Sequence, residues 1–274
     1  MKFSLQDQNI LNHLHMAGDA SPHLEALFHF YEELFHLQFA FKAQLKETDH
    51  AGFPVDHEID LTRLASGIPQ ASFDELHMEA ATFVDLYRDV EALLIRDTGY
   101  LPPDNGEPLP ETILSHAREI FDSRVPLVGA GQPADVIRAA SALVLAPYVQ
   151  LACERIMPRI TQDAWHYGYC PVCGGSPSFA VVYAEPAFRT LLCSRCNAEW
   201  RFRRLGCPFC MERDHQTYYP GEEGGYRLYV CEACHRYLKS IDMRESASER
   251  CLPFETIAAV AMDLAAQEKG SLFF

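Results

Sequence analysis

Four segments of the chain decide its fold: YCPVC at 169–173, LLCSRC at 191–196, GCPFC at 206–210 and YVCEAC at 229–234. Each segment holds two cysteines with two residues between them, and together they contain eight of the ten cysteines. Two intervening residues allow a tight turn that brings both sulfur atoms to one side, and two such turns complete a tetrahedron around one metal ion. The sequence therefore predicts metal-binding modules in this half of the chain.

The cysteine segments form two tandem repeats with a period of 37 to 38 residues. The first pair is separated from the second by 19 residues, and the third from the fourth by 20. Both values fit the spacing of metal ribbons, in which about 15 to 20 residues separate two C-x2-C pairs. We therefore predict two ions, each bound by four thiolates. The expected ligands are Cys170, Cys173, Cys193 and Cys196 in the first module, and Cys207, Cys210, Cys231 and Cys234 in the second.

The ligand type alone leaves the identity of the ions open. Four thiolates around zinc give a closed structural site, whereas the same ligands around ferric iron give a centre that exchanges one electron. Disulfides are not expected, because the amino terminus turns polar at once and lacks the apolar core of a signal peptide. We expect a cytoplasmic protein with reduced thiols. The two remaining cysteines, Cys153 and Cys251, are interpreted as small buried apolar residues.

The residue after the second cysteine of each pair bears on the predicted turns, because this position often needs a positive φ angle. Gly174, Asn197 and His235 suit such a conformation. Met211 does not, so a looser or different turn is expected at the first pair of the second module.

Residues 1–165 are predicted to form an all-helical domain. Apolar residues recur every three or four positions over 24–45 and 76–94, which is typical of amphipathic helices. Ser72 and Glu75 have the spacing of a capping box, so the second of these helices is expected to begin near Ser72.

Weaker helical patterns cover 111–121 and 134–156. The second contains Pro147, which is expected to kink or split the helix. The longest mainly apolar stretch, Ala139–Ala152, falls short of the roughly 20 residues that cross a bilayer, so no membrane span is expected.

Strand patterns lie among the cysteine pairs. Short runs at 179–183, 200–203 and 226–230 predict β-strands in antiparallel hairpins, and 254–268 predicts a closing helix. The predicted fold class is α+β in two parts, with an N-terminal all-α domain, two tandem metal ribbons and a C-terminal helix. The expected boundaries are 1–165, 166–205, 206–252 and 253–274.

The charge of the chain disfavours a nucleic-acid partner. It carries 38 acidic and 23 basic residues, and 25 of the acidic residues lie within 1–165. A formal net charge of -15 repels polyanions. The run WRFRR at 200–204 could stack on bases and contact phosphates. A strand that buries Trp200 and Phe202 explains the same run without nucleic acid.

No catalytic signature is found in the sequence. It lacks a G-x-S-x-G elbow, a Walker loop, an H-E-x-x-H motif and a dinucleotide fingerprint, so no enzymatic activity is expected. Among the histidines, His13 and His15 would diverge on a helix, while His29 and His36 lack a third ligand. We therefore predict no histidine metal site.

A family resemblance rests on the cysteine segments and the residues around them. The matching residues are CPVCG at 170–174, LCSRC at 192–196, EW at 199–200, Arg204, CPFC at 207–210, CEAC at 231–234, YLK at 237–239, AMDLA at 261–265 and Gly270. In this combination the chain resembles the formate dehydrogenase accessory protein FdhE family. The resemblance covers about 165–270, and the helical half matches only in general character.

The resemblance implies rubredoxin-like modules that bind iron, so iron is favoured over zinc, and it implies the same eight cysteine ligands. It also implies a cytoplasmic maturation factor that contacts the catalytic molybdenum subunit of a formate dehydrogenase and is required for its activity. The oligomeric state is not predicted. Two alternatives stay open: a rubredoxin-like electron carrier, and a zinc-ribbon adaptor for nucleic acid.

Overall fold

The structure is a computed structural model of the whole chain, and its described residues form two compact units. The helical unit is built from described residues within 3–57, 71–123 and 136–155, and the sheet unit from those within 58–70 and 156–268. The finer boundaries expected at 165, 205 and 252 stay a prediction. The described residues are 3–48, 53–99, 106, 108–123, 136–184, 188–214, 216–221, 225–244 and 250–268.

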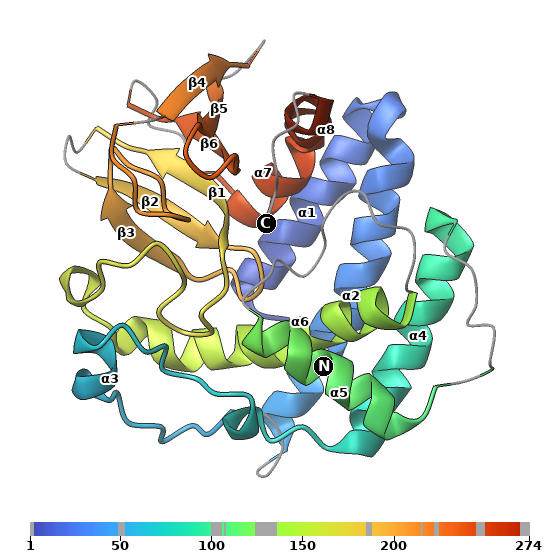
Figure 1. Cartoon of the computed structure of the whole chain (residues 1–274). Helices are drawn as coiled ribbons and strands as arrows, with labels where there is room; N and C mark the ends of the chain where they lie inside the picture. Colours follow the sequence, from blue (N-terminus) through green and yellow to red (C-terminus); the bar gives the residue numbers. More distant parts are fainter. Residues whose placement is uncertain are drawn as a thin grey trace. The chain divides into compact units, whose positions relative to one another are not determined.

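The helical unit confirms the predicted all-helical character of the first part of the chain. In it α1 packs against α2, α2 against α4, and α4 against α5 (Figure 1). The described helices of this unit are α1 (Leu5–Ala20), α2 (Glu25–Glu47), α4 (Ala80–Thr98), α5 (Pro110–Asp122) and α6 (Val136–Ile156), with short 3-10 turns at Pro22–Leu24 and Asp74–Leu76.

The helix α6 is the core of the helical unit. Most of its residues are buried, and Pro147 lies inside it without dividing it, so of the predicted kink or split the split is wrong. Among the described residues, one stretch, Val136–Arg159, is long and apolar enough to cross a membrane by length and composition. Within the structure 83% of its apolar window is buried, which is typical of a central helix in a folded unit.

The helix α4 starts later than the sequence predicts. Ser72 and Glu75 do interact, since the Ser72 backbone N–H and hydroxyl both donate to the Glu75 carboxylate at 2.7 Å. The segment after them is only a 3-10 turn, because His77 adopts a left-handed conformation with φ +44° that interrupts the helix. The α-helix begins at Ala80 and ends at Thr98, and the following Gly99, with a φ of +74°, is its C-terminal cap.

The sheet unit contains one six-stranded sheet with the order β3-β2-β1-β6-β5-β4. Within each ribbon the strands pair antiparallel, as predicted. Between the ribbons β1 pairs parallel with β6, which corrects the expectation of antiparallel pairing throughout and joins both modules into one sheet. The strands are β1 (Pro177–Val182), β2 (Phe188–Cys193), β3 (Glu199–Arg203), β4 (Gln216–Pro220), β5 (Tyr226–Cys231) and β6 (Tyr237–Asp242).

Two short helices close the sheet unit where a single helix over 254–268 was predicted. They are α7 (Leu252–Ala258) and α8 (Val260–Glu268), and the break falls at Ala259. α7 packs against β1 and α8 against β6 (Figure 1). Other described elements of this unit are α3 (Leu61–Ala65) and the 3-10 turns Met157–Arg159 and Gln162–Ala164.

A buried polar cluster fixes α8 to β6. Asp263 accepts hydrogen bonds from the Tyr237 hydroxyl at 2.8 Å and from Lys239 Nζ at 2.7 Å, and Lys239 also donates to the Thr256 carbonyl at 2.7 Å. The Lys239 side chain is 2% exposed, so its charge depends on this pairing. The cluster thus joins YLK at 237–239 to the aspartate of AMDLA at 261–265.

Candidate metal centres

The first centre is formed by the cysteines of the first ribbon. Cys170 and Cys173 lie in the turn before β1, Cys193 ends β2, and Cys196 lies in the turn before β3. The Cys170 and Cys196 sulfurs are 3.5 Å apart, as are those of Cys173 and Cys193. The Cys173 and Cys196 sulfurs are 3.6 Å apart.

The second centre repeats this arrangement in the second ribbon. The Cys207 and Cys234 sulfurs are 3.7 Å apart, and those of Cys210 and Cys231 are 3.6 Å apart. In each group of four, all sulfurs lie within 4.8 Å of one another. The structure thus brings the eight cysteines together in the two groups that the sequence predicts.

The sulfur separations fit a tetrahedral metal and not a disulfide. A metal–sulfur bond of about 2.3 Å places neighbouring sulfurs of a tetrahedron about 3.8 Å apart. A disulfide would require about 2.05 Å. All ten cysteines are free thiols in the structure. The donor set and its geometry could therefore hold two metal ions.

All four turns share one backbone pattern. The N–H of each first cysteine donates to the carbonyl five residues later: Gly175 for Cys170, Ala198 for Cys193, Glu212 for Cys207 and Arg236 for Cys231. This bond closes the turn on itself and fixes the direction of both cysteine side chains. Two further N–H groups point at sulfur, from Val172 to Cys170 and from Arg195 to Cys193, each at 3.4 Å.

The residue after each second cysteine has a positive φ angle in all four turns. The values are +58° at Asn197, +57° at His235 and +71° at Gly174. Met211 also has a φ of +65°, so the expectation of a different turn there is wrong. The tetrahedral arrangement imposes the same backbone on methionine, at a cost of about 1 to 2 kcal/mol for a residue with a Cβ atom.

The two centres differ in exposure. All four cysteines of the first centre are buried, with at most 3% exposed surface. In the second centre Cys207 and Cys231 are buried, Cys234 is half-buried and Cys210 is exposed. Solvent and other molecules therefore reach only the second centre through its cysteine side chains.

Burial also controls the protonation of the thiols. It raises the pKa of the Cys170 thiol well above its usual value and that of Cys234 to about 11. Hydrogen bonding with the other three sulfurs of its centre lowers the pKa of Cys173. Thiols with raised pKa values are protonated at neutral pH without a metal, so metal binding would displace protons.

A segment far upstream in the sequence supports the first centre. The Gln70 backbone N–H donates to the Pro171 carbonyl at 2.9 Å, and the Tyr169 hydroxyl donates to the Gly67 carbonyl at 2.6 Å. Gly67 has a φ of +72°, and a Cβ atom there would lie 2.5 Å from the Tyr167 ring. This support was not predicted from the sequence, where Gly67 after a short helical pattern was the available signal.

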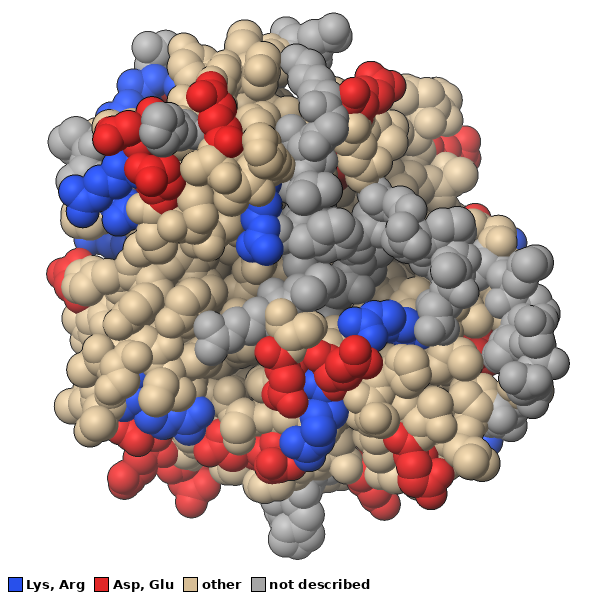
Figure 2. All heavy atoms as spheres, in the orientation of Figure 1, with Lys and Arg blue, Asp and Glu red and all other residues tan. Residues whose placement is uncertain are grey.

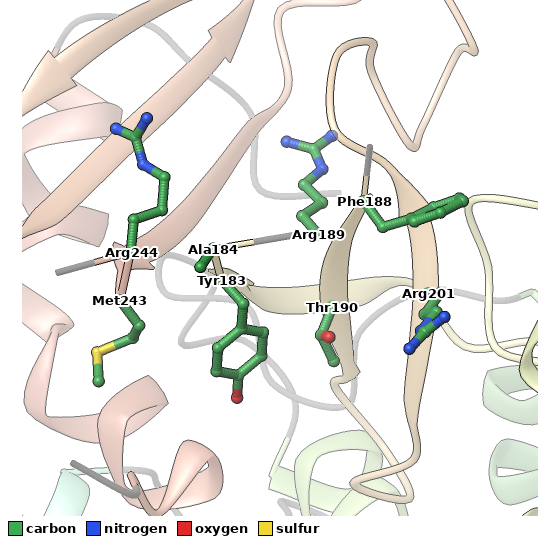
Figure 3. Close-up of a pocket in the computed structure, with 8 residues that line it drawn as sticks. All are labelled: Tyr183, Ala184, Phe188, Arg189, Thr190, Arg201, Met243 and Arg244. Carbon is green, nitrogen blue, oxygen red and sulfur yellow. The ribbon is translucent and has the colours of Figure 1, made fainter. Parts of the chain in front are cut away.

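A surface pocket of about 420 Å³ lies beside the first ribbon, and none of the eight cysteines lines it (Figure 3). We assign it no ligand. Its lining residues are Tyr183, Ala184, Phe188, Arg189, Thr190, Arg201, Met243 and Arg244.

Comparison with known proteins finds a family model that matches the first ribbon. Residues 169–204 match the family model described as FdhE, central domain. The resemblance to the FdhE family is confirmed. A curated protein FdhE homolog from Aquifex aeolicus (strain VF5) is 32% identical over 143 residues, which cover 50% of this chain and 49% of that protein. The homolog from Shewanella baltica (strain OS185) is 30% identical over 105 residues, 37% of this chain and 35% of that protein.

The chain thus matches about half or less of the length of these FdhE relatives. A solved structure extends the likeness to the whole fold. The crystal structure of the FdhE protein from Pseudomonas aeruginosa superposes with a TM-score of 0.60 at 21% identity, covering 96% of this chain and 92% of that one. The two chains share a fold, including the helical unit, where the sequence shows only a general likeness.

Proposed function

We propose that this protein is a metal-binding accessory factor that is needed to assemble or activate a formate dehydrogenase and docks on its catalytic molybdenum subunit. The observation that carries the proposal is the FdhE central domain at 169–204, which coincides with a four-cysteine centre. We expect a cytoplasmic protein that performs no enzymatic turnover alone.

In this proposal the two groups of four cysteines each bind one ion. The first ion would be held by Cys170, Cys173, Cys193 and Cys196, and the second by Cys207, Cys210, Cys231 and Cys234. The resemblance to the FdhE family favours iron, with zinc as the alternative. A bound ion would cross-link two turns of each ribbon, and iron would additionally supply a one-electron centre.

Exposed apolar side chains on the second ribbon and directly before it support a docking role. Leu205 and Met211 are 73% and 40% exposed, and Tyr218 and Tyr219 on β4 are 54% and 39% exposed. Aromatic residues and methionine are enriched in protein interfaces. In contrast, Trp200 and Phe202 are 1% and 2% exposed, so they are not available to stack on bases, which counts against the nucleic-acid adaptor.

The charge distribution supports a protein client over a polyanion. On the face shown in Figure 2, acidic and basic side chains mix over the sheet, while acidic side chains predominate along the lower edge of the view. This pattern agrees with the excess of acidic residues within 1–165.

A pull-down tests the proposed docking. The tagged full chain is incubated with the apo catalytic subunit of a formate dehydrogenase, next to the variants Cys193→Ser and Cys231→Ser and the control Cys153→Ser, whose thiol belongs to neither centre. We expect the wild type and Cys153→Ser to retain the subunit and the two centre variants to lose it. Failure of the wild type to retain it, or equal retention by all variants, would contradict the proposal.

A second candidate function is that of an electron carrier, which the exposure of Cys210 favours because an open edge shortens the path to a redox partner. An anaerobically purified iron form would then show a visible absorption that a reductase bleaches reversibly at catalytic rates. A metal analysis that finds zinc in both centres would exclude this function.

A further inference from the structure

Two side chains extend from the first ribbon to the backbone of the second centre. The turn of the β2–β3 hairpin contains two ligands of the first centre, because β2 ends at Cys193 and β3 begins three residues after Cys196. The other end of this hairpin carries Arg189, and Arg203 is the last residue of β3. Both arginines reach the turn that holds Cys207 and Cys210.

Arg189 holds the start of that turn. Its Nη2 donates to the Gly206 carbonyl at 2.5 Å, directly before Cys207. The side chain is 1% exposed, and its guanidinium carbon lies 5.6 Å from the Phe202 ring centre and 5.7 Å from that of Tyr229. Figure 3 shows the Arg189 side chain extending from β2 next to Thr190.

Arg203 holds the end of the same turn. Its Nη2 donates to the Met211 carbonyl at 2.5 Å, directly after Cys210. Gly206 makes room for this arginine, since a Cβ atom there would lie 2.6 Å from Arg203 Nε. The carbonyls on both sides of the Cys207–Cys210 pair thus accept hydrogen bonds from the first ribbon.

A backbone contact joins the first turns of the two ribbons as well. Gly168 precedes Cys170 by two residues, and a Cβ atom at Gly168 would lie 1.8 Å from the carbonyl oxygen of Pro208. Pro208 directly follows Cys207. The first turns of the two ribbons are therefore in direct backbone contact.

Charge complementarity strengthens this connection. The Nε and Nη1 atoms of Arg189 are buried and have no hydrogen-bond partner among the described residues. A buried cation without a counter-charge is costly. Four thiolates around zinc or ferric iron carry a net negative charge, so a loaded second centre would compensate the arginine next to it.

We infer that Arg189 and Arg203 are positioning residues of the second centre, through which metal binding at the first centre strengthens metal binding at the second. The inference rests on the metal binding proposed above. Coupling between two sites is reciprocal, so each ion raises the affinity for the other by the same factor. A chelator should remove the ion of the second centre first, because Cys210 of that centre is exposed.

Cobalt(II) tests the inference in the full chain. The protein is loaded anaerobically with two equivalents of cobalt(II) and titrated with a chelator while the thiolate-to-cobalt absorption is recorded. We expect Arg189→Met and Arg203→Met to weaken one of the two ions by about 10- to 100-fold, the usual effect of losing a residue that supports metal ligands. The first ion is removed last, when the second centre is already empty, so its measured affinity should not change, whereas a general loss of structure would weaken both ions.

Matched variants complete the test. Arg201→Met removes an arginine of the same hairpin whose guanidinium carbon lies 5.8 Å from the Phe188 ring centre. This variant should leave the affinities for both ions unchanged. Cys193→Ser should abolish binding of the first ion and weaken the second by the coupling factor, and Cys231→Ser should abolish the second ion and weaken the first by that same factor. Wild-type affinities in both arginine variants, or an unaffected second ion in Cys193→Ser, would overturn the coupling. A wild type that binds no cobalt would overturn the proposed metal binding itself.

Discussion

The two candidate centres have the same ligands and the same turns but different surroundings. The first is fully buried, and Gly174 and Asn197 occupy its two left-handed positions. The second exposes Cys210 and places Met211 and His235 at the corresponding positions. Ligand spacing therefore fixes the coordination geometry, while the packing around each ribbon decides how accessible and how strained its centre is.

Removing one cysteine ligand should have the largest effect, and this effect should differ between the two centres. Cys173→Ser removes a buried ligand and should unfold the first ribbon, because metal binding contributes on the order of 10 kcal/mol to the folding of modules this small. Cys210→Ser removes an exposed ligand and should leave one ion bound and most of the sheet intact. Metal equivalents per chain and circular dichroism measure the difference. Equal loss of ions and sheet in both variants would contradict the distinction.

The contact between α8 and β6 should contribute strongly to the stability of the second ribbon. Asp263→Ala leaves the buried Lys239 charge without its carboxylate, and we expect a loss of about 3 to 5 kcal/mol in the free energy of unfolding. Glu268→Ala, an exposed change on the same helix, should cost less than about 0.5 kcal/mol. Urea denaturation of the metal-loaded protein measures both, and similar midpoints would refute the role of Asp263.

The backbone contact between the ribbons can be tested with a single methyl group. Gly168→Ala places a Cβ atom against the Pro208 carbonyl and should destabilise the sheet unit by about 1 to 3 kcal/mol. Gly18→Ala is the control, because its Cβ atom would lie in ordinary contact with Phe28 Cβ at 3.9 Å, and alanine favours the helix by up to about 1 kcal/mol. Thermal unfolding should shift in opposite directions, and a neutral Gly168→Ala would show that the turns move independently.

The smallest expected effect concerns the strained turn of the second centre. Met211→Asn should stabilise the protein by about 0.5 to 1 kcal/mol, because asparagine tolerates a positive φ angle better than methionine. Met211→Leu keeps the strain and should give no gain. Chelator titration of the second ion compares the two variants. A gain with leucine equal to that with asparagine would point to packing as the cause.

Local chemistry made much of the site predictable. The groups of four followed from the spacing of two and of 19 to 20 residues, and the structure brings together the same eight cysteines. The turn at Met211 was predicted wrongly, because methionine rarely adopts a positive φ angle and the constraint from the four cysteines overrides this preference. The later start of α4 was missed because the left-handed His77 gives no signal in a helical pattern.

Contacts between distant segments were beyond the sequence. The hydrogen bonds of Gly67 and Gln70 to the first turn join residues about one hundred positions apart. Neither segment carries a sequence pattern that predicts this contact. The parallel pairing of β1 with β6 likewise depends on how two complete ribbons pack together.

The sequence by itself determined which atoms can bind metal and how they are grouped, because thiol chemistry and a two-residue spacing act within a single turn. Only the tertiary structure decided that one centre is enclosed and the other open, and that Arg189 and Arg203 connect them. Burial and side-chain reach depend on the packing of strands from different ribbons, which no local pattern specifies.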